Sequence, residues 1–333
     1  MEENFKVGSP NLLIETVKDA LWSISSLLTQ CMSSRTKSIE INGTQYTIIK
    51  YLSEGAFSYV YLVQDGANLY ALKKITNGGF EAEVSCYQRF RSRYIIRLLN
   101  YSIQDGIINL IFPYFKNGNL QDYINVNSAF SEQASLKLFS GICQGVQALH
   151  EYSPKNSSSY PPSTLDDDED VEILPYAHRD IKPGNVMLAD DGSPVLMDFG
   201  SCIRARIRVN NRSEALIQQD MAAEHSSMPY RAPELFDVKS DTTLDEKVDI
   251  WSLGCTLYAL AYSHSPFEDP KQAAQGGSIA MAAQSGRYNY PPNYSNSDTL
   301  KTIIDACLKV DPSQRPTITQ LITMTEHALS GGV

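Results

Sequence analysis

The spacing of apolar residues changes along this chain. Between Tyr46 and about residue 115, short β-rich runs at 46–52, 57–63, 69–73 and 109–115 are separated by turns, and such runs predict strands. From residue 131 to 150, apolar residues recur every three or four positions, as on the buried side of a helix. The pattern predicts a β-rich region followed, after residue 130, by a buried helix.

An amphipathic helix is predicted before the first strand. Within residues 11–32, apolar residues lie three or four positions apart, at Leu13, Val17, Leu21, Ile24 and Leu28. Residues 33–38 are a polar linker. This helix docks on the folded body or on a partner, or it lies on a membrane surface; the pattern leaves these alternatives open.

A second short-range pattern predicts a β-hairpin. Two apolar runs within residues 186–197 flank a turn that contains Asp-Gly. Because a hairpin returns its outer ends to one edge, Asn185 and Asp198 are expected side by side. Mg²⁺ takes one or two such oxygen ligands together with phosphate oxygens. Asp180, on the loop that enters the same edge, is placed to act as a base.

Composition narrows the class of protein. The chain has 333 residues, of which 42% are hydrophobic and 20% charged, as in an ordinary globular protein. Its net charge of -10 argues against a nucleic-acid partner, which calls for clustered Lys and Arg. Much of this charge falls in residues 151–175, which also carry Ser and Pro runs. Since this composition cannot build a core, we expect a disordered surface insertion there.

Cysteine usage and hydropathy predict a cytoplasmic protein. The six cysteines are scattered without a Cys-x-x-Cys pair, which fits neither a disulfide framework nor a zinc site. Cys143 and Cys255 lie in apolar stretches and are interpreted as packing residues. No apolar run approaches the roughly 20 residues of a membrane span, and the N-terminus lacks the pattern of a signal peptide.

Three motifs stand in a characteristic order and spacing. They are His-Arg-Asp at 178–180 followed by Asn185, Asp-Phe-Gly at 198–200, and Ala-Pro-Glu at 232–234. The set resembles the signature of eukaryotic protein kinases. A single Asp-Phe-Gly could stand at the solvated end of any hairpin, but the ordered set requires the kinase context.

Other segments resemble one particular group of protein kinases. Glu-Gly-Ala-Phe-Ser-Tyr-Val at 54–60, Tyr-Arg-Ala-Pro-Glu-Leu-Phe at 230–236 and Asp-Ile-Trp-Ser-Leu-Gly-Cys at 249–255 resemble the Numb-associated kinase group. Within that group the chain is similar to the myristoylated and palmitoylated serine/threonine kinases and their fungal vacuolar-membrane relatives.

The resemblance implies a bilobal protein kinase fold of the α+β class. A small antiparallel β lobe with one helix is expected at 39–112, a hinge at 113–118 and a larger, mainly helical lobe at 119–329. The N-terminal helix and linker at 1–38 precede this domain, and the acidic insertion at 151–175 interrupts it.

The activity implied is transfer of the ATP γ-phosphate to Ser or Thr hydroxyls of protein substrates. Asp180 is expected to accept the hydroxyl proton, Lys182 to neutralise the γ-phosphate, and Asn185 and Asp198 to hold Mg²⁺. Lys182, two residues after Asp180, is typical of serine/threonine kinases. The alternative is a pseudokinase that serves as a scaffold, and it is prompted by an altered glycine-rich loop. Every charged catalytic position is nevertheless occupied.

The altered loop spans residues 52–60. It departs from Gly-x-Gly-x-x-Gly because only Gly55 remains, but small side chains still permit close approach of a phosphate. The residues expected to bind the nucleotide are Leu52, Ser53, Glu54, Gly55, Ala56, Phe57, Ser58, Tyr59, Val60, Ala71, Lys73, Glu83, Pro113, Phe115, Met187 and Asp198.

Lys73 needs an anionic partner to stay charged and oriented. The two-residue period of a strand places it on the same face as Ala71. Glu81 and Glu83 both precede an apolar helical stretch. We choose Glu83, because its spacing to a strand expected at 95–98 suits the pairing better and because Tyr87 then lies one turn further on the same face.

The resemblance also implies structural pairings in the large lobe. Ser227 is expected to contact Asp180 and Lys182, Asp249 to support the catalytic loop, and Arg315 to pair with Glu234. Residues 213–224 are good helix formers preceded by capping residues, so we expect a helix inside the activation segment. Such a helix would make phosphorylation of the segment dispensable.

Position 2 is Glu2 and not Gly, which excludes N-myristoylation. Cys31 follows the amphipathic helix and remains as an acceptor for palmitoylation. An acyl chain and an embedded helix together supply the two signals that stable anchoring requires. We therefore expect a cytoplasmic protein with peripheral attachment to the cytosolic face of vacuole or Golgi membranes.

Overall fold

The computed structural model describes residues 37–55, 58–76, 81–154, 173–268, 278–292 and 297–331. The N-terminal helix with Cys31, the middle of the acidic insertion, and Ala56 and Phe57 lie outside these residues. By its contacts the described chain divides into two compact units. One contains the residues up to Thr76 and Arg97–Tyr114, and the other contains Glu81–Ile96 and the residues from Phe115 onward.

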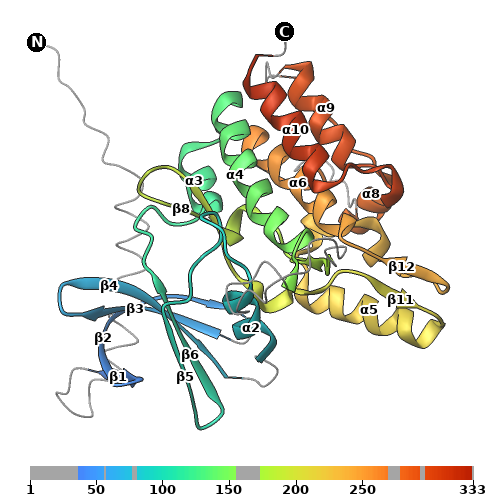
Figure 1. Ribbon diagram of the computed structural model, residues 1–333. Coiled ribbons are helices and arrows are strands. Elements are labelled where there is room, and N and C mark those ends of the chain that lie inside the picture. The colour runs from blue at the N-terminus through green and yellow to red at the C-terminus, as the bar shows by residue number, and fades with distance from the viewer. Residues whose placement is uncertain are drawn as a thin grey trace, which may run out of the picture. The chain divides into compact units, whose positions relative to one another are not determined.

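The first unit is an antiparallel sheet, as predicted (Figure 1). Among the described residues it has six strands in the order β1-β2-β3-β4-β6-β5. Their bounds are β1 (Ser38–Ile41), β2 (Thr44–Gly55), β3 (Ser58–Asp65), β4 (Asn68–Ile75), β5 (Asn100–Gln104) and β6 (Ile107–Pro113). Alternate side chains of neighbouring strands meet on one face, and a core forms from Ile41, Tyr46, Val63, Leu72 and Ile111.

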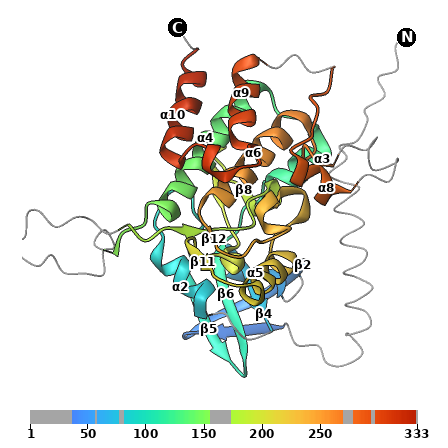
Figure 2. The ribbon, with the colours of Figure 1, turned by 90° about the vertical axis from the view of Figure 1, so that its right-hand side faces the viewer.

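The second unit is mainly helical. Its helices are α2 (Glu81–Arg89), α3 (Leu120–Asn127), α4 (Glu132–His150), α5 (Arg212–His225), α6 (Lys247–Tyr262), α8 (Ile279–Ser285), α9 (Asp298–Cys307) and α10 (Ile318–Leu329). Helices α4, α6, α9 and α10 pack against one another (Figure 2). Every residue of α6 after Lys247 is buried, as expected of a helix that is apolar all round. An antiparallel sheet and a mainly helical unit confirm the predicted α+β kinase fold.

Short two-stranded ribbons connect the helices of the second unit. The predicted hairpin is present as β8 (Val186–Leu188) and β9 (Pro194–Leu196). The other ribbons pair β7 (Tyr176–Ala177) with β10 (Ile203–Arg204) and β11 (Ile207–Val209) with β12 (Thr242–Leu244).

The helix predicted within the activation segment is confirmed as α5. It begins after Asn211, whose side chain accepts a hydrogen bond from the backbone N–H of Glu214. This cap satisfies one of the N–H groups that a helix start leaves without a partner.

The strand expected at 95–98 is not formed. Ile95 makes one isolated bridge to Leu196, and the Ile96 N–H donates to the Leu196 carbonyl at 2.9 Å. Ile95 and Ile96 are both buried. A short apolar run signals burial but does not by itself show whether the burial comes from a ladder of strands.

The described ends of the acidic insertion are held together. α4 ends at His150, and the Leu174 N–H donates to the Tyr152 carbonyl at 2.8 Å. The Ala205 N–H donates to the Pro175 carbonyl at 2.9 Å. Residues 151–154 and 173–175 therefore belong to the second unit, and the expectation of disorder rests on the part of the insertion outside the described residues.

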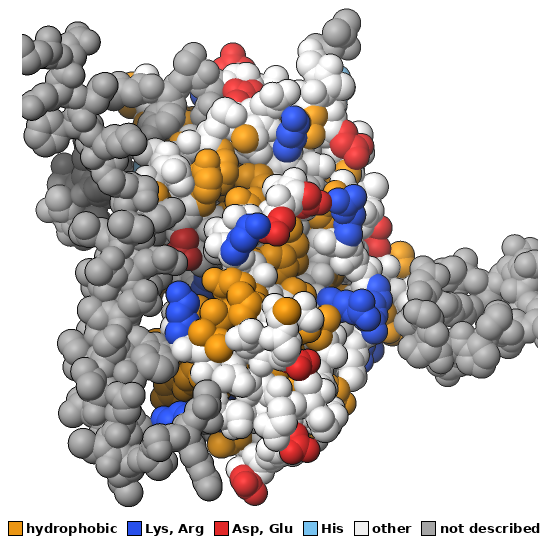
Figure 3. Space-filling view, turned by 90° about the vertical axis from the view of Figure 1, so that its left-hand side faces the viewer, with side chains coloured by type: hydrophobic (Ala, Val, Ile, Leu, Met, Phe, Trp, Pro, Cys, Tyr) orange, Lys and Arg blue, Asp and Glu red, His pale blue; other side chains and the backbone are white. Residues whose placement is uncertain are grey.

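The surface carries charges of both signs. On the face drawn in Figure 3, Lys and Arg side chains stand among Asp, Glu and apolar side chains. The absence of a nucleic-acid partner stays a prediction. Among the described residues, no helix combines the length and the apolar character needed to cross a membrane.

Candidate active site

Asp180, Lys182 and Asn185 converge in the loop before the hairpin. Lys182 Nζ lies 2.8 Å from Asp180 Oδ2. Asn185 Nδ2 donates both to the Asp180 carbonyl at 2.8 Å and to Asp180 Oδ2 at 2.9 Å. The orientation of the carboxylate is therefore set by its own loop, within which Pro183–Asn185 form a single 3₁₀ turn.

Ser227 completes the contacts of this carboxylate, as predicted. Its backbone N–H donates to Asp180 Oδ1 at 2.8 Å, and its Oγ lies 2.6 Å from Lys182 Nζ. The loop before the Ala-Pro-Glu motif is thus joined directly to the loop that carries Asp180.

Asp249 anchors the same loop from the first turn of α6. Its carboxylate is fully buried and accepts the backbone N–H groups of His178 at 2.7 Å and Arg179 at 2.8 Å. His150 Nε2 lies 3.0 Å from the same carboxylate. Arg179 has a φ of +67°, a conformation that non-glycine residues rarely adopt. The contacts of Asp249 compensate for this local strain.

The hairpin brings Asn185 and Asp198 to one edge, as predicted. The Met197 N–H donates to the Asn185 carbonyl at 2.9 Å, so Asp198 follows directly on the residue opposite Asn185. Asp198 adopts a left-handed conformation, with a φ of 64°. The amide nitrogen of Asn185 is engaged by Asp180, which leaves the amide oxygen as the atom suited to ligate a cation. These residues fit a Mg²⁺ site.

Glu83 is buried on α2 and faces the Asp-Phe-Gly motif. The Tyr87 hydroxyl donates to Glu83 Oε1 at 3.1 Å and accepts the Phe199 N–H at 3.4 Å. Burial and the carboxylates of Glu83 and Asp198 raise the pKa of Tyr87 well above its usual value. A Cβ atom on Gly200 would lie 3.5 Å from oxygens of both Asp198 and Glu83. Tyr87 therefore lies on the predicted face and links α2 to the Asp-Phe-Gly motif.

The predicted residues of the first unit lie on adjacent strands. In the register, Lys73 of β4 pairs with Val60 and with Leu110, and Ala71 pairs with Phe112. Leu52, Ser53, Glu54 and Gly55 end β2, and Ser58, Tyr59 and Val60 begin β3. Pro113 ends β6. Lys73 and Glu83 belong to different units, and their partnership stays a prediction.

Phe115 precedes a turn of the second unit, and Met187 lies in β8. The Gly118 N–H donates to the Phe115 carbonyl at 3.2 Å, and Met187 forms an isolated bridge with Asn119. Their contact with a nucleotide also stays a prediction.

The family model for the protein kinase domain matches residues 46–325 of this chain. The chain belongs to the protein kinase family. Serine/threonine-protein kinase ppk13 of Schizosaccharomyces pombe is 37% identical over 85% of this chain and 90% of its own length. Serine/threonine-protein kinase ENV7 of Saccharomyces cerevisiae is 34% identical over 89% of this chain and 95% of its own length. Human serine/threonine-protein kinase 16 is 36% identical over 89% of this chain and 94% of its own length.

These relatives and the family match identify the chain as a serine/threonine protein kinase that uses ATP. The predicted relationship to the serine/threonine kinase family with fungal members is confirmed, and the pseudokinase alternative is not favoured. Membership of the Numb-associated group stays a prediction.

The activation segment of this kinase contains contacts that the sequence analysis missed. Arg179 Nη1 donates to Gln218 Oε1 of α5 at 3.3 Å. Ser201 Oγ donates to the His225 carbonyl at 2.7 Å, and Arg231 Nη2 donates to the Ser226 carbonyl at 2.6 Å. Gln218 follows the apolar pair Leu216 and Ile217 and belongs to no sequence motif. Its contact with Arg179 is therefore seen only in the folded structure.

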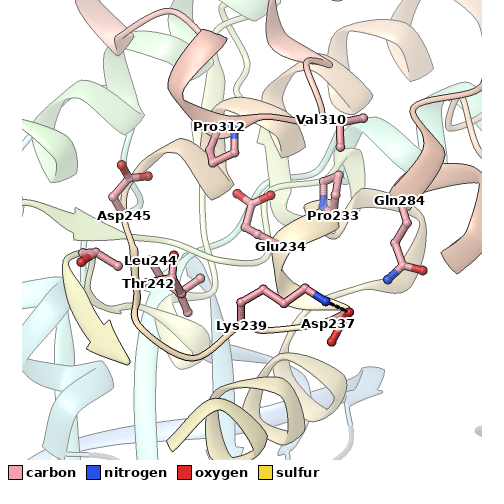
Figure 4. Close-up of a pocket in the computed structure, with 11 residues that line it drawn as sticks. Pro233, Glu234, Asp237, Lys239, Thr242, Leu244, Asp245, Gln284, Val310 and Pro312 are labelled. Carbon is pink, nitrogen blue, oxygen red and sulfur yellow. Dashed lines mark hydrogen bonds and ion pairs between the residues drawn. The ribbon is translucent and has the colours of Figure 1, made fainter. Parts of the chain in front are cut away.

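The pairing of Arg315 with Glu234 is confirmed, with both guanidinium contacts between 2.7 and 2.8 Å. A cavity of about 260 Å³ lies beside Glu234 (Figure 4). Asp245 and Gln284 also line it, whereas Asp180, Asn185 and Asp198 do not. This cavity is therefore separate from the residues predicted to act in catalysis and metal binding.

Proposed function

We propose that the kinase transfers the γ-phosphoryl group of MgATP to a protein Ser or Thr hydroxyl, with Asp180 as the base. The observation that supports this best is the set of three donors on the Asp180 carboxylate, from Lys182, Asn185 and Ser227. They hold the carboxylate in one orientation, which is the main contribution a protein makes to phosphoryl transfer. Asp180 orients the hydroxyl and accepts its proton.

Lys182 stands beside this carboxylate, where it neutralises charge on the γ-phosphate. Asn185 and Asp198 are the residues that would hold Mg²⁺, and the ion when bound offsets the negative charge of the phosphates. Lys73, held by Glu83, positions the α- and β-phosphates. The rest of the nucleotide is bound by the altered glycine-rich loop from Leu52 to Val60 and by four further residues, Ala71, Pro113, Phe115 and Met187.

The role of Asp180 is tested with labelled ATP and a Ser/Thr peptide library. We expect Asp180→Asn to lower the rate of transfer by about two orders of magnitude or more, because the amide cannot accept the proton. Asp190→Asn is the matched control, since Asp190 contacts Lys116 at an exposed position. Equal transfer by the Asp180 variant and the wild type would remove Asp180 from this role.

We expect the kinase to be active without phosphorylation of its activation segment. Arg179, the residue that pairs with a phosphate in many kinases, here contacts Gln218 of α5. Packing of α5 replaces the charge contact that otherwise orders such a segment. Phosphatase treatment, checked by intact mass, should leave the rate of transfer essentially unchanged. Loss of activity after the treatment would contradict this expectation.

The kinase associates peripherally with the cytosolic face of vacuole or Golgi membranes through its N-terminal helix and an acyl chain on Cys31. The support is the predicted apolar helix face that ends near Cys31, because an embedded helix and an acyl chain supply the two signals that stable anchoring requires. In cell fractionation, Cys31→Ser should move the protein from the membrane pellet to the soluble fraction. A variant that stays in the pellet would show that Cys31 is not the anchor, and a wholly soluble wild type would make the helix a docking element.

A further inference from the structure

Two cysteines that are far apart in the sequence meet where α2 packs against the segment after the Asp-Phe-Gly motif. Cys86 lies on α2, three residues after Glu83, and Cys202 lies four residues after Asp198. Cys86 Sγ donates to the Cys202 carbonyl oxygen at 4.0 Å, and the Cys202 side chain lies close enough to influence the pKa of the Cys86 thiol. Their side chains are buried, with exposed fractions of 3% and 4%. Both belong to the second unit, so this contact lies within one compact body.

Among the described cysteines, only Cys86 has a lowered pKa, and the pKa of Cys202 is raised. Cys143, Cys255 and Cys307 lie in α4, α6 and α9, and burial raises the pKa of each thiol. The hydrogen bond from Cys202 lowers the pKa of Cys86, and the Arg89 guanidinium contributes, although burial opposes both. Because the thiolate is the nucleophile in thiol chemistry, Cys86 is the most reactive of these five.

We propose that Cys86 and Cys202 form a reversible disulfide when the kinase meets a hydroperoxide. The Cys86 thiolate attacks a peroxide oxygen, the O–O bond breaks, and the hydroxide that leaves is protonated to water. The product is a sulfenic acid on Cys86. The Cys202 sulfur then attacks the Cys86 sulfur, loses its proton and expels a second hydroxide, which also becomes water. In sum, two thiols and one hydrogen peroxide give one disulfide and two waters.

This bond ties α2 to the segment that follows the Asp-Phe-Gly motif. The two residues are 116 positions apart, so the cross-link closes a long loop and restricts the unfolded chain. It also restrains the two elements that carry Glu83 and Asp198. Because both thiols are buried, the reaction proceeds through local opening of α2 and is slower than the oxidation of an exposed thiol.

The test is peptide mapping of the full-length kinase after treatment with hydrogen peroxide. Remaining thiols are alkylated under denaturing conditions, and the digest is analysed without reduction. We expect a linked peptide that joins Cys86 to Cys202 and that disappears after dithiothreitol. The oxidised kinase should also unfold at a higher temperature than the reduced one, and the α2 amides should exchange hydrogen more slowly. A map without this peptide, or one in which Cys143 is joined to Cys307, would overturn the proposal.

Two variants separate this pair from the other buried cysteines. Cys202→Ala should abolish the linked peptide and let Cys86 proceed to sulfinic acid, while losing the rise in unfolding temperature on oxidation. Cys307→Ala, which removes another fully buried thiol, should keep both the linked peptide and the rise in unfolding temperature on oxidation. If the unfolding temperature of Cys202→Ala still rises on oxidation, the stabilising disulfide joins other cysteines and the proposal is wrong. The wild-type map decides the question even where a variant does not fold.

Discussion

Asp198→Asn is expected to lower the turnover of the kinase by about two orders of magnitude or more, the scale of losing one charge contact made to the transition state. The substitution removes a full anionic ligand from the proposed Mg²⁺ site. The fold should survive, because Asn is among the few residues that adopt the left-handed conformation which Asp198 has at a φ of 64°. Initial rates at saturating ATP measure the effect.

Asp191→Asn is the matched control for this experiment. Asp191 lies in the turn of the same hairpin, its side chain is 63% exposed, and its Oδ1 accepts the Ser193 N–H. An Asn keeps that acceptor, so turnover and stability should stay close to those of the wild type. Wild-type turnover in a well-folded Asp198→Asn protein would refute the assignment of Asp198 as a metal ligand.

Asp249→Asn is expected to reduce both stability and activity. The amide group would turn at least one N–H toward the backbone donors of His178 or Arg179, or toward His150, and a buried donor would lose its acceptor. Breaking a buried charged network of this kind costs about 3 kcal/mol or more. Because the loop that carries Asp180 loses its anchor, turnover should fall as well. Urea unfolding and initial rates provide the two measurements.

The control for Asp249→Asn is Asp241→Asn. Asp241 is exposed and has a φ of 58°, a conformation that Asn also adopts. A surface change of this kind should alter the free energy of unfolding by no more than about 0.5 kcal/mol. Equal losses in the two variants would mean that the buried network around Asp249 has no special weight.

The acid dependence of stability gives a second readout for Asp249. Burial alone would raise the pKa of Asp249, but the hydrogen bond from His150 and the charges of His150 and His178 lower it on balance. A group whose pKa is lowered by folding stabilises the protein above its usual pKa and loses this contribution as the pH falls through its folded value. The free energies of unfolding of wild type and Asp249→Asn should therefore approach each other as the pH falls below about 4.

Several features of this kinase could be derived from local sequence. The Asp-Gly turn between two apolar runs determines the β8–β9 hairpin, and its geometry brings Asn185 and Asp198 to one edge. Capping residues followed by good helix formers predicted α5 within a residue or two of its observed ends. Because these elements are specified by neighbouring residues, their patterns are legible without the rest of the chain.

Other features depend on contacts between segments that are distant in the sequence. The apolar run at 95–98 is buried against β9 without forming a strand, and periodicity does not distinguish these outcomes. The contact of Arg179 with Gln218, the place of His150 beside Asp249 and the meeting of Cys86 with Cys202 follow from packing alone. Local sequence determines which way a backbone turns and which side chains are available. Only tertiary packing decides which buried polar groups become partners, because each must find a partner wherever the fold places one.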